Sequence, residues 1–396
     1  MHTIRGVPRD YAWGSTDAIP RLLGVPSDDV PVAELWFGAH PSAPARVEGA
    51  RVADLAALID ADPSAVLGDD VRARFGDRLP YLLKIIAPQR PLSLQVHPHL
   101  HRAGVGFDAE ERAGIPVDAP HRSYRDRNHK PELVYALTPF EALCGFRAPR
   151  RAAELFAGLA SPLAEKLHAL LRSEPSPEGV RAAFTCLLEA DSRPSPEDVR
   201  VLVEACRQRL RSGSTSPRAD STVLTLAAAY PGDPGIAASL LLNPVSLQPG
   251  EALFVPAGGV HAYLGGLGVE IMASSDNVLR AGLTTKHVDV DELLEAVDYV
   301  AAPPIRTAPE VFHGATRVFY APVDDFELSI TDIADEDVHP LPGRGPRILL
   351  CLEGRVTVTS EGDERLVARG QAVFVPASEG ALTACGTGTL VQADVP

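Results

Sequence analysis

The sequence predicts a mainly β protein that carries one all-helical insertion. Two observations support this fold class. Short apolar runs punctuated by Gly and Pro, which are typical of strands, lie on both sides of a segment with helical periodicity. A strand-like segment with its flanking turns also recurs 120 residues downstream, from Gly250 to Gly370, so the β regions contain two related units.

The segment from about Arg150 to Arg211 has the helical pattern, with Leu and Phe recurring every three or four residues. Three helix starts are marked by serine before proline, because the hydroxyl caps the first turn and proline suits the first helical position; they are Ser161-Pro162, Ser176-Pro177 and Ser195-Pro196. We therefore expect a helical insertion domain at residues 150–220. It would separate a first β domain, residues 1–149 and 221–312, from a C-terminal β domain, residues 313–396.

The repeat distinguishes the two β regions. Gly250-EALFV-Pro256-Ala257-Gly258 recurs as Gly370-QAVFV-Pro376-Ala377-Ser378. A glycine, a short strand and a proline form a common turn pattern, but agreement at four further positions, Ala, Phe, Val and Ala, favours a true repeat. His261 in the first copy aligns with Ala381 in the second. We expect only the first copy to hold a ligand and the second to act as a scaffold.

Composition excludes several classes of protein. A net charge of -15 and a pI near 5.3 argue against nucleic acid or an anionic membrane as a partner. The five cysteines are odd in number and scattered, which favours neither a disulfide framework nor a thiolate zinc site and suggests a reduced, cytoplasmic setting. No segment approaches the roughly 20 apolar residues needed to span a membrane. Because the net charge is negative, an anionic substrate would need a local basic pocket.

One strand-like run, PLSLQVHP, places polar groups on a single face. Ser93, Gln95 and His97 lie two residues apart, so on a strand they point the same way while the leucines and valine between them point the other way. Polar groups that face a barrel interior need a partner, and a metal ion would be one. A lone histidine is more often hydrogen-bonded than metal-bound, so this run is weak evidence by itself.

Two further segments supply possible ligands. Glu132 follows Pro131 at the start of the apolar run LVYAL, although a Glu beside Lys130 could also be a solvated surface acid. His261 and Tyr263 share a strand face after a Gly-rich turn. Together with Gln95 and His97, these segments offer two imidazoles, one carboxylate and one amide oxygen, a set that suits zinc or a similar divalent ion.

The motifs resemble a known family. GEALFVPAGGVHAYLG resembles the second cupin motif, with Gly265 where that motif usually has Asn, and Gln95-Val96-His97 stands in place of the first motif's His-x-His. YAWGS, AELWFGAHPSAPA, NHKPE, FEALCGFR and EIMASSDNVLRAGLTTKH complete a pattern similar to type I mannose-6-phosphate isomerases of the cupin superfamily. The resemblance covers nearly the whole chain. It implies two cupin-type (jelly-roll) β-barrels plus an all-α domain.

The resemblance also implies a function. The chain would be a monomeric aldose–ketose isomerase that interconverts mannose 6-phosphate and fructose 6-phosphate through an enediol-type intermediate. One divalent ion per chain, with zinc favoured, would be held by Gln95, His97, Glu132 and His261. The expected catalytic residues are His129, Lys130, Glu270 and Arg280, and the expected substrate-binding residues are Lys84, Ser93, Tyr263 and Lys286. From the residues alone, Arg280 could equally form a structural ion pair near Asp276.

Two other functions fit a cupin with these ligands. An iron-dependent cupin dioxygenase also presents histidines and a glutamate around an open metal position. Gln95 in place of a histidine and the whole-chain resemblance count against it, and oxygen consumption would identify it. A sugar-binding or storage cupin would keep the barrel without turnover, which the intact set of four ligands disfavours.

Overall fold

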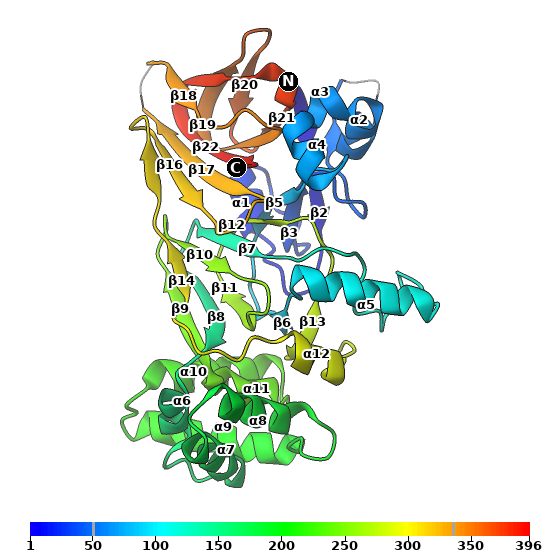
Figure 1. Cartoon of the computed structure of the whole chain (residues 1–396). Helices are drawn as coiled ribbons and strands as arrows, with labels where there is room; N and C mark the ends of the chain where they lie inside the picture. Colours follow the sequence, from blue (N-terminus) through cyan, green and yellow to red (C-terminus); the bar gives the residue numbers. More distant parts are fainter. Residues whose placement is uncertain (50–51, 335–336) are drawn as a thin grey trace.

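The computed structural model describes residues 1–49, 52–334 and 337–396. Three sheets and one helical region follow one another along the long axis of the molecule (Figure 1). Both chain ends lie in the sheet drawn at the top, and the helical region lies at the bottom. The chain is thus mostly β with a helical segment in the middle of its sequence, as predicted.

The uppermost sheet has ten strands in the order β15-β16-β17-β22-β19-β21-β1-β4, with β18 paired to β22 and β20 to β19. Its N-terminal strands β1 and β4 come from the first 50 residues, so the start of the chain completes the C-terminal sheet. RILLCLEG and RVTVTS form one strand, β19, which is interrupted by a bulge between Cys351 and Glu353. The bounds are β1 (His2–Arg5), β4 (Arg46–Val47), β15 (Glu310–Phe312), β16 (Thr316–Tyr320), β17 (Glu327–Ile333), β18 (His339–Leu341), β19 (Arg347–Thr359), β20 (Glu364–Ala368), β21 (Ala372–Val375) and β22 (Leu382–Asp394).

The two sheets in the middle of the molecule carry the candidate site. One has seven strands in the order β14-β10-β7-β12-β5-β3-β2, and the other has five in the order β13-β6-β11-β8-β9. The seven strands are β2 (Val7–Arg9), β3 (Glu34–Phe37), β5 (Tyr81–Ile86), β7 (Glu132–Ala136), β10 (Ala252–Val255), β12 (Gly268–Ala273) and β14 (Ile305–Thr307). The five are β6 (Leu94–Val96), β8 (Phe140–Phe146), β9 (Leu242–Leu247), β11 (His261–Gly265) and β13 (Leu279–Gly282).

Strand alternation separates the two faces of the seven-stranded sheet. On β7, Leu133 and Tyr135 belong to the hydrophobic core shared with the C-terminal sheet, whereas Val134 belongs to the core shared with the five-stranded sheet. Glu132 lies two residues before Val134, so it faces the five-stranded sheet as well. This period of two brings charged residues of buried strands to one interior surface.

The helical region runs from Pro149 to Leu241. It contains α6 (Pro149–Phe156), α7 (Pro162–Ser173), α8 (Pro177–Leu188), α9 (Pro196–Arg211), α10 (Pro217–Ala229), α11 (Gly235–Ala238) and the short η1 (Ser239–Leu241). The three predicted starts are confirmed, because the hydroxyls of Ser161, Ser176 and Ser195 each cap the first turn of the helix that follows. Residue 220 lies inside α10, so the helices continue beyond the expected boundary.

The helical region packs against the five-stranded sheet. Leu94 and Val96 of β6 share a core with the buried leucines of α7 to α10. Gln95, between them, is thereby turned to the opposite face. The insertion therefore helps to hold the polar face of β6 toward the interior of the middle layer.

Further helices lie outside the insertion, where the sequence suggested only strands. They are α1 (Ala18–Leu23), α2 (Leu55–Ala61), α3 (Pro63–Leu67), α4 (Asp69–Phe75), α5 (Leu100–Arg112), α12 (Val290–Ala296) and the short η2 (Ala377–Glu379). Helix α5 projects from the body of the molecule (Figure 1). Among the residues described, no helix is both long and apolar enough to cross a membrane.

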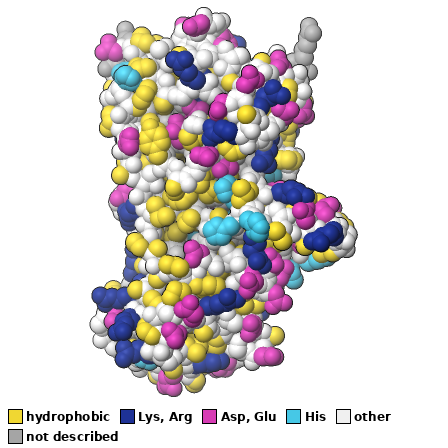
Figure 2. Space-filling view, in the orientation of Figure 1, with side chains coloured by type: hydrophobic (Ala, Val, Ile, Leu, Met, Phe, Trp, Pro, Cys, Tyr) yellow, Lys and Arg dark blue, Asp and Glu magenta, His cyan; other side chains and the backbone are white. Residues whose placement is uncertain are grey.

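The two repeat copies adopt the same local structure. Strands β10 and β21 have bounds that differ by 120 residues, and Gly250 and Gly370 that precede them both have positive φ, at 93° and 80°. The copies then diverge, because His261 begins β11 whereas Ala381 only precedes β22. Figure 2 shows histidine side chains gathered at mid-height, beside the base of α5.

Candidate metal centre and active-site cavity

Three ligand side chains meet between the two middle sheets. Glu132 begins β7, His261 begins β11 and His97 directly follows β6. Their ligand atoms lie within 4.8 Å of one another and all three residues are buried. Glu132 Oε1 is 3.1 Å from His97 Nε2, and its Oε2 is 3.4 Å from His261 Nε2. The two imidazoles and the carboxylate therefore converge, as the sequence predicted.

Backbone carbonyls orient both imidazoles. His97 Nδ1 lies 2.7 Å from the carbonyl oxygen of Asn277, and His261 Nδ1 lies 3.0 Å from that of Gly259. Each Nδ1 can donate its proton there, which leaves the Nε2 lone pair directed at Glu132. His97 Nε2 is buried and has no hydrogen-bond partner. A divalent ion would satisfy that atom, so the donor set fits zinc.

The electrostatics of the ligands also suit a metal. Burial lowers the pKa of His97 to about 4, although Glu132 opposes the shift. Burial alone would raise the pKa of Glu132, but the neighbouring His97, Lys130 and His261 hold it well below its usual value. Burial thus favours a neutral His97, and its neighbours favour a Glu132 carboxylate, the forms that bind metal ions.

Gln95 lies at the centre of the five-stranded sheet's polar face. It pairs with His261 on β11 and with Arg280 on β13, and directly opposed residues of neighbouring strands project to the same face. Its Nε2 donates to Ser93 Oγ at 3.3 Å, so the amide oxygen is the group left for a metal. Ser93 and Gln95 share a face, which confirms the alternation read from PLSLQVHP.

A buried ion-pair network adjoins the ligands on the other sheet. Lys84 on β5 faces Glu270 on β12, with Nζ 3.0 Å from Glu270 Oε2 and 3.6 Å from Oε1 of Glu34 on β3. Burial would lower the pKa of Lys84, but the two carboxylates raise it above its ordinary value. Burial raises the pKa of Glu270, against the influence of Lys84. Lys84 is therefore paired with two carboxylates on the wall of the cavity described next.

A cavity of about 540 Å³ lies over these groups. Three of the chain's four lysines line it, namely Lys84, Lys130 and Lys286. Lys130 Nζ lies 3.5 Å from Glu132 Oε1, which places an amine beside the ligands. Tyr263 donates its hydroxyl to Glu132 Oε2 at 3.4 Å. Lysine is so scarce in this chain that its concentration here marks the cavity as a functional site.

Three cations of the cavity have no acidic partner. Within the described part of the chain, Arg125, Arg280 and Lys286 form no ion pair with a carboxylate. Burial and the nearby Arg125 lower the pKa of Arg280, and burial with both arginines lowers that of Lys286. In a protein with a net charge of -15, three such cations in one cavity favour an anion as its ligand.

The structure separates the expected site residues into two groups. Eleven of the twelve lie at the cavity or at the ligands, but His129 does not line the cavity, and its Nε2 is 2.9 Å from Asp325 Oδ2 in the C-terminal region. Arg280 does not form the alternative ion pair with Asp276, which lies instead 3.4 Å from His40. Sequence reasoning missed Glu34 and Arg125, which also line the cavity.

Asn277 links the ligand His97 to the backbone of residues 125–128, which includes Arg125. It is fully buried, and its backbone oxygen binds His97. Its Oδ1 accepts the backbone N–H groups of Arg125 and Asp126 at 2.7 and 3.2 Å, and its Nδ2 donates to the carbonyl oxygens of Asp126 and Asn128 at 2.8 Å each. One side chain thus fixes the backbone of residues 125–128 relative to His97.

Asn277→Ala keeps the backbone oxygen that binds His97 but loses the side chain that fixes residues 125–128, so we expect metal binding to weaken by up to about tenfold. The backbone groups left unpaired should also cost about 1–3 kcal/mol each in stability. Metal titration and thermal unfolding would measure the two effects. Asn277→Asp is a second variant: it keeps the Oδ1 acceptor but turns a buried carboxylate oxygen toward the oxygens of Asp126 and Asn128, so it should be at least as destabilised as Asn277→Ala. Wild-type metal affinity in a folded Asn277→Ala protein would contradict this role.

Comparisons with known proteins agree with this geometry. The family model of the type I phosphomannose isomerase catalytic domain matches residues 1–149, and that of the mannose-6-phosphate isomerase cupin domain matches residues 315–395. The chain is 40% identical to the mannose-6-phosphate isomerase of Escherichia coli over 390 residues, 97% of both chains. It is 33% identical to the Bos taurus enzyme, covering 94% of this chain and 92% of the other.

Solved structures give the same result. The mannose 6-phosphate isomerase of Salmonella typhimurium, in a crystal structure with fructose 6-phosphate and zinc, superposes with a TM-score of 0.89 at 37% sequence identity. The match covers 99% of this chain and 98% of that one. The chain belongs to the type I phosphomannose isomerase family.

Proposed function

We propose that this chain interconverts mannose 6-phosphate and fructose 6-phosphate. The observation that carries the proposal is that one cavity combines a metal-ligand set with three unpaired cations. The ligand set suits the carbonyl end of an open-chain sugar, and the cations suit its phosphate. Mannose-6-phosphate isomerases match nearly the whole chain, and this similarity supports mannose 6-phosphate as the substrate.

The substrate would lie across the cavity between these two groups. Arg125 and Lys286 would bind the phosphate, and Arg280 would lie between the phosphate and the reacting carbons, because it is opposite Gln95 on the neighbouring strand. Ser93 and Tyr263 line the same cavity and hold Gln95 and Glu132 in place through their hydroxyls. Ser93, Tyr263 and Lys286 would therefore contact the substrate. Lys84 would act indirectly, through its ion pair with Glu270.

The reaction moves a proton between two adjacent carbons of the opened sugar. A divalent ion, with zinc favoured, held by Gln95, His97, Glu132 and His261 would polarise the carbonyl as a Lewis acid. Lys130 and Glu270 are the groups on the cavity wall that we assign to proton transfer. Arg280 would stabilise the negative charge that develops on the substrate oxygens in the enediol-type intermediate. His129 is left out of this set because it pairs with Asp325.

Three further features belong to the proposal. The architecture would consist of two cupin-type barrels and an all-α domain. The repeat strands β10 and β21 lie in different sheets, as expected if each barrel contains one copy of the repeat. Its domain boundaries would fall near residues 149, 241 and 312, because the helices continue past residue 220 to Leu241, and β1 and β4 would complete the C-terminal barrel. The protein would be a monomer in the cytoplasm. A single chain supplies every cavity residue named above, so the cavity needs no partner chain to complete it. Sedimentation would test the monomer.

A coupled assay with mannose 6-phosphate tests the function. Zinc-loaded protein should convert mannose 6-phosphate to fructose 6-phosphate and also catalyse the reverse reaction. No conversion in either direction by folded, zinc-loaded protein would overturn the proposal.

Lys286→Ala should raise the KM for mannose 6-phosphate about 10- to 100-fold and leave kcat nearly unchanged. A charge-assisted hydrogen bond to a phosphate that is equally strong in ground and transition states contributes to binding alone, and its loss costs roughly 1.5–3 kcal/mol. The measurement is a steady-state titration. Lys166→Ala on α7, which removes an exposed lysine outside the cavity, is the matched control. An unchanged KM in Lys286→Ala would remove Lys286 from the phosphate site.

A further inference from the structure

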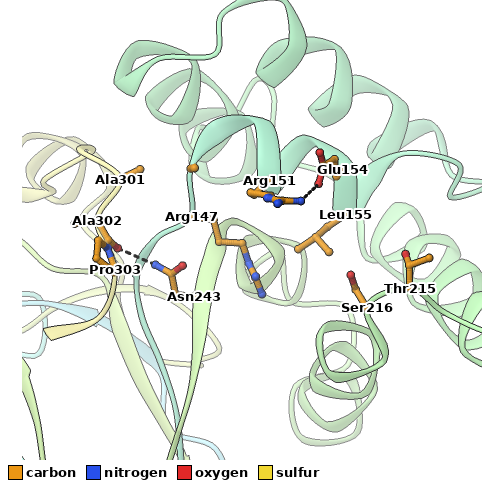
Figure 3. A pocket seen from close by; sticks show the side chains of 11 residues that line it. Arg147, Arg151, Glu154, Leu155, Thr215, Ser216, Asn243, Ala301, Ala302 and Pro303 are labelled. Atoms are coloured by element: carbon orange, nitrogen blue, oxygen red, sulfur yellow. Dashed lines mark hydrogen bonds and ion pairs between the residues drawn. The ribbon is translucent and has the colours of Figure 1, made fainter. Parts of the chain in front are cut away.

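A second cavity, of about 590 Å³, lies where the helical region meets the five-stranded sheet (Figure 3). It shares no lining residue with the catalytic cavity. Its walls come from Arg147, Ala148 and helix α6, from the two residues before α10, from Asn243 on β9 and from residues 301–303. The proposed isomerase reaction gives this cavity no role.

Arg147 is the central polar group of this cavity. It follows β8 and its side chain extends into the space between Asn243 and Leu155 (Figure 3). Its Nε is buried without a hydrogen-bond partner, and no carboxylate of the described ranges forms an ion pair with it. Burial and the nearby Arg218 lower its pKa to about 10. The terminal Nη groups also form no hydrogen bond with the described residues, so they can bind an anion in the cavity, which would supply an acceptor and the opposite charge.

Further donors surround Arg147. Arg151 lines the cavity beside it and is paired with Glu154 at 2.9 Å, so that acid is already neutralised. Thr215 and Ser216 contribute hydroxyls at the start of α10, and the Ser216 hydroxyl does not cap that helix. The Asn243 Nδ2 is occupied by carbonyl oxygens, including that of Ala302 at 3.1 Å. The donors that remain are the guanidinium groups and the two hydroxyls.

We propose that this cavity binds a small phosphate ester, with the phosphate on Arg147 and the Thr215 and Ser216 hydroxyls. Guanidinium groups bind phosphate through paired hydrogen bonds, which is the partner that Arg147 lacks. Leu155, Ala301 and Pro303 give the cavity an apolar wall against which the organic part would lie. The volume leaves room for more than a bare phosphate ion. This site is independent of the proposed isomerase reaction, because its residues are not those of the catalytic cavity.

Equilibrium dialysis with radiolabelled inorganic phosphate tests the site on the full chain. The comparison is between Arg147→Gln and Arg200→Gln. Arg200 is an exposed arginine of α9 paired with Glu197, so both variants lose one positive charge from the helical region or its edge. The catalytic cavity is the same in both, and any phosphate bound there cancels in the comparison. We expect Arg147→Gln to bind one phosphate fewer per chain, or to bind it at least tenfold more weakly.

Equal phosphate binding by the two variants would overturn the proposal. If Arg147→Gln does not fold, Ser216→Ala decides, because that hydroxyl does not cap α10 and its removal should leave the fold intact. A several-fold rise in the apparent Kd for phosphate relative to Arg200→Gln would support the site. An unchanged Kd would exclude it, and conversion of mannose 6-phosphate by wild type would still establish the catalytic function separately.

Discussion

His261→Ala is expected to remove the bound metal and to lower kcat by about 10³-fold or more. His261 supplies one of two imidazoles, and its Nε2 has no competing backbone partner, because the Gly259 carbonyl takes Nδ1. Lewis-acid polarisation of a carbonyl contributes several kcal/mol to the transition state, and each 1.36 kcal/mol is a factor of ten in rate. Metal analysis of the purified variant and the coupled assay would measure both effects. His97→Ala should behave in the same way.

The control separates loss of the metal from loss of the fold. His101→Ala replaces an exposed histidine of α5 and should keep wild-type metal content and rate. A chelator should inactivate the wild type, and added zinc should restore it but should not restore His261→Ala. Full turnover in verified metal-free wild type would show that the ligand set does not serve catalysis. Circular dichroism of each variant shows whether the sheets are intact.

The ligand set could be predicted because it depends on short-range rules. Alternation along PLSLQVHP places Gln95 on the interior face, and the repeat distinguishes His261 from Ala381 without knowledge of the fold. The Ser-Pro pairs predict helix starts for the same reason, since a cap involves residues only three apart. The helices α2 and α3 carry comparable caps, Asp54 and Asp62, so their absence from the sequence prediction was avoidable.

His129 shows an available signal that went unused. In an extended segment, Lys130 and Glu132 share one side, so His129 must face the other. The structure has this arrangement, with Lys130 beside Glu132 and His129 on Asp325. By contrast, no local rule joins Arg125 to the site, because the bond that fixes its backbone comes from Asn277, 152 residues away. Glu34 likewise reaches Lys84 only through the pairing of β3 with β5.

Arg280→Ala is expected to lower kcat by a factor of about 10² or more while metal content and thermal stability stay near wild type. The loss of a preorganised donor to developing charge commonly has this effect. The structural ion pair that the sequence left open predicts a different result, because removing one partner of a buried pair costs several kcal/mol. Since no carboxylate of the described residues pairs with Arg280, the variant should fold. Steady-state kinetics, metal analysis and thermal unfolding measure the three quantities.

Arg280→Lys then distinguishes charge from geometry. Lysine keeps the positive charge but loses the planar set of donors, so a residue that must present two N–H groups to substrate oxygens should remain severely impaired. If Arg280 instead bound phosphate equally in the ground and transition states, as expected for Lys286, KM would rise and kcat would change little. The position of Arg280 opposite Gln95, beside a proposed metal ligand, favours the effect on kcat. Near-normal kcat in Arg280→Lys would show that positive charge alone is sufficient and that Arg280 has no specific catalytic geometry.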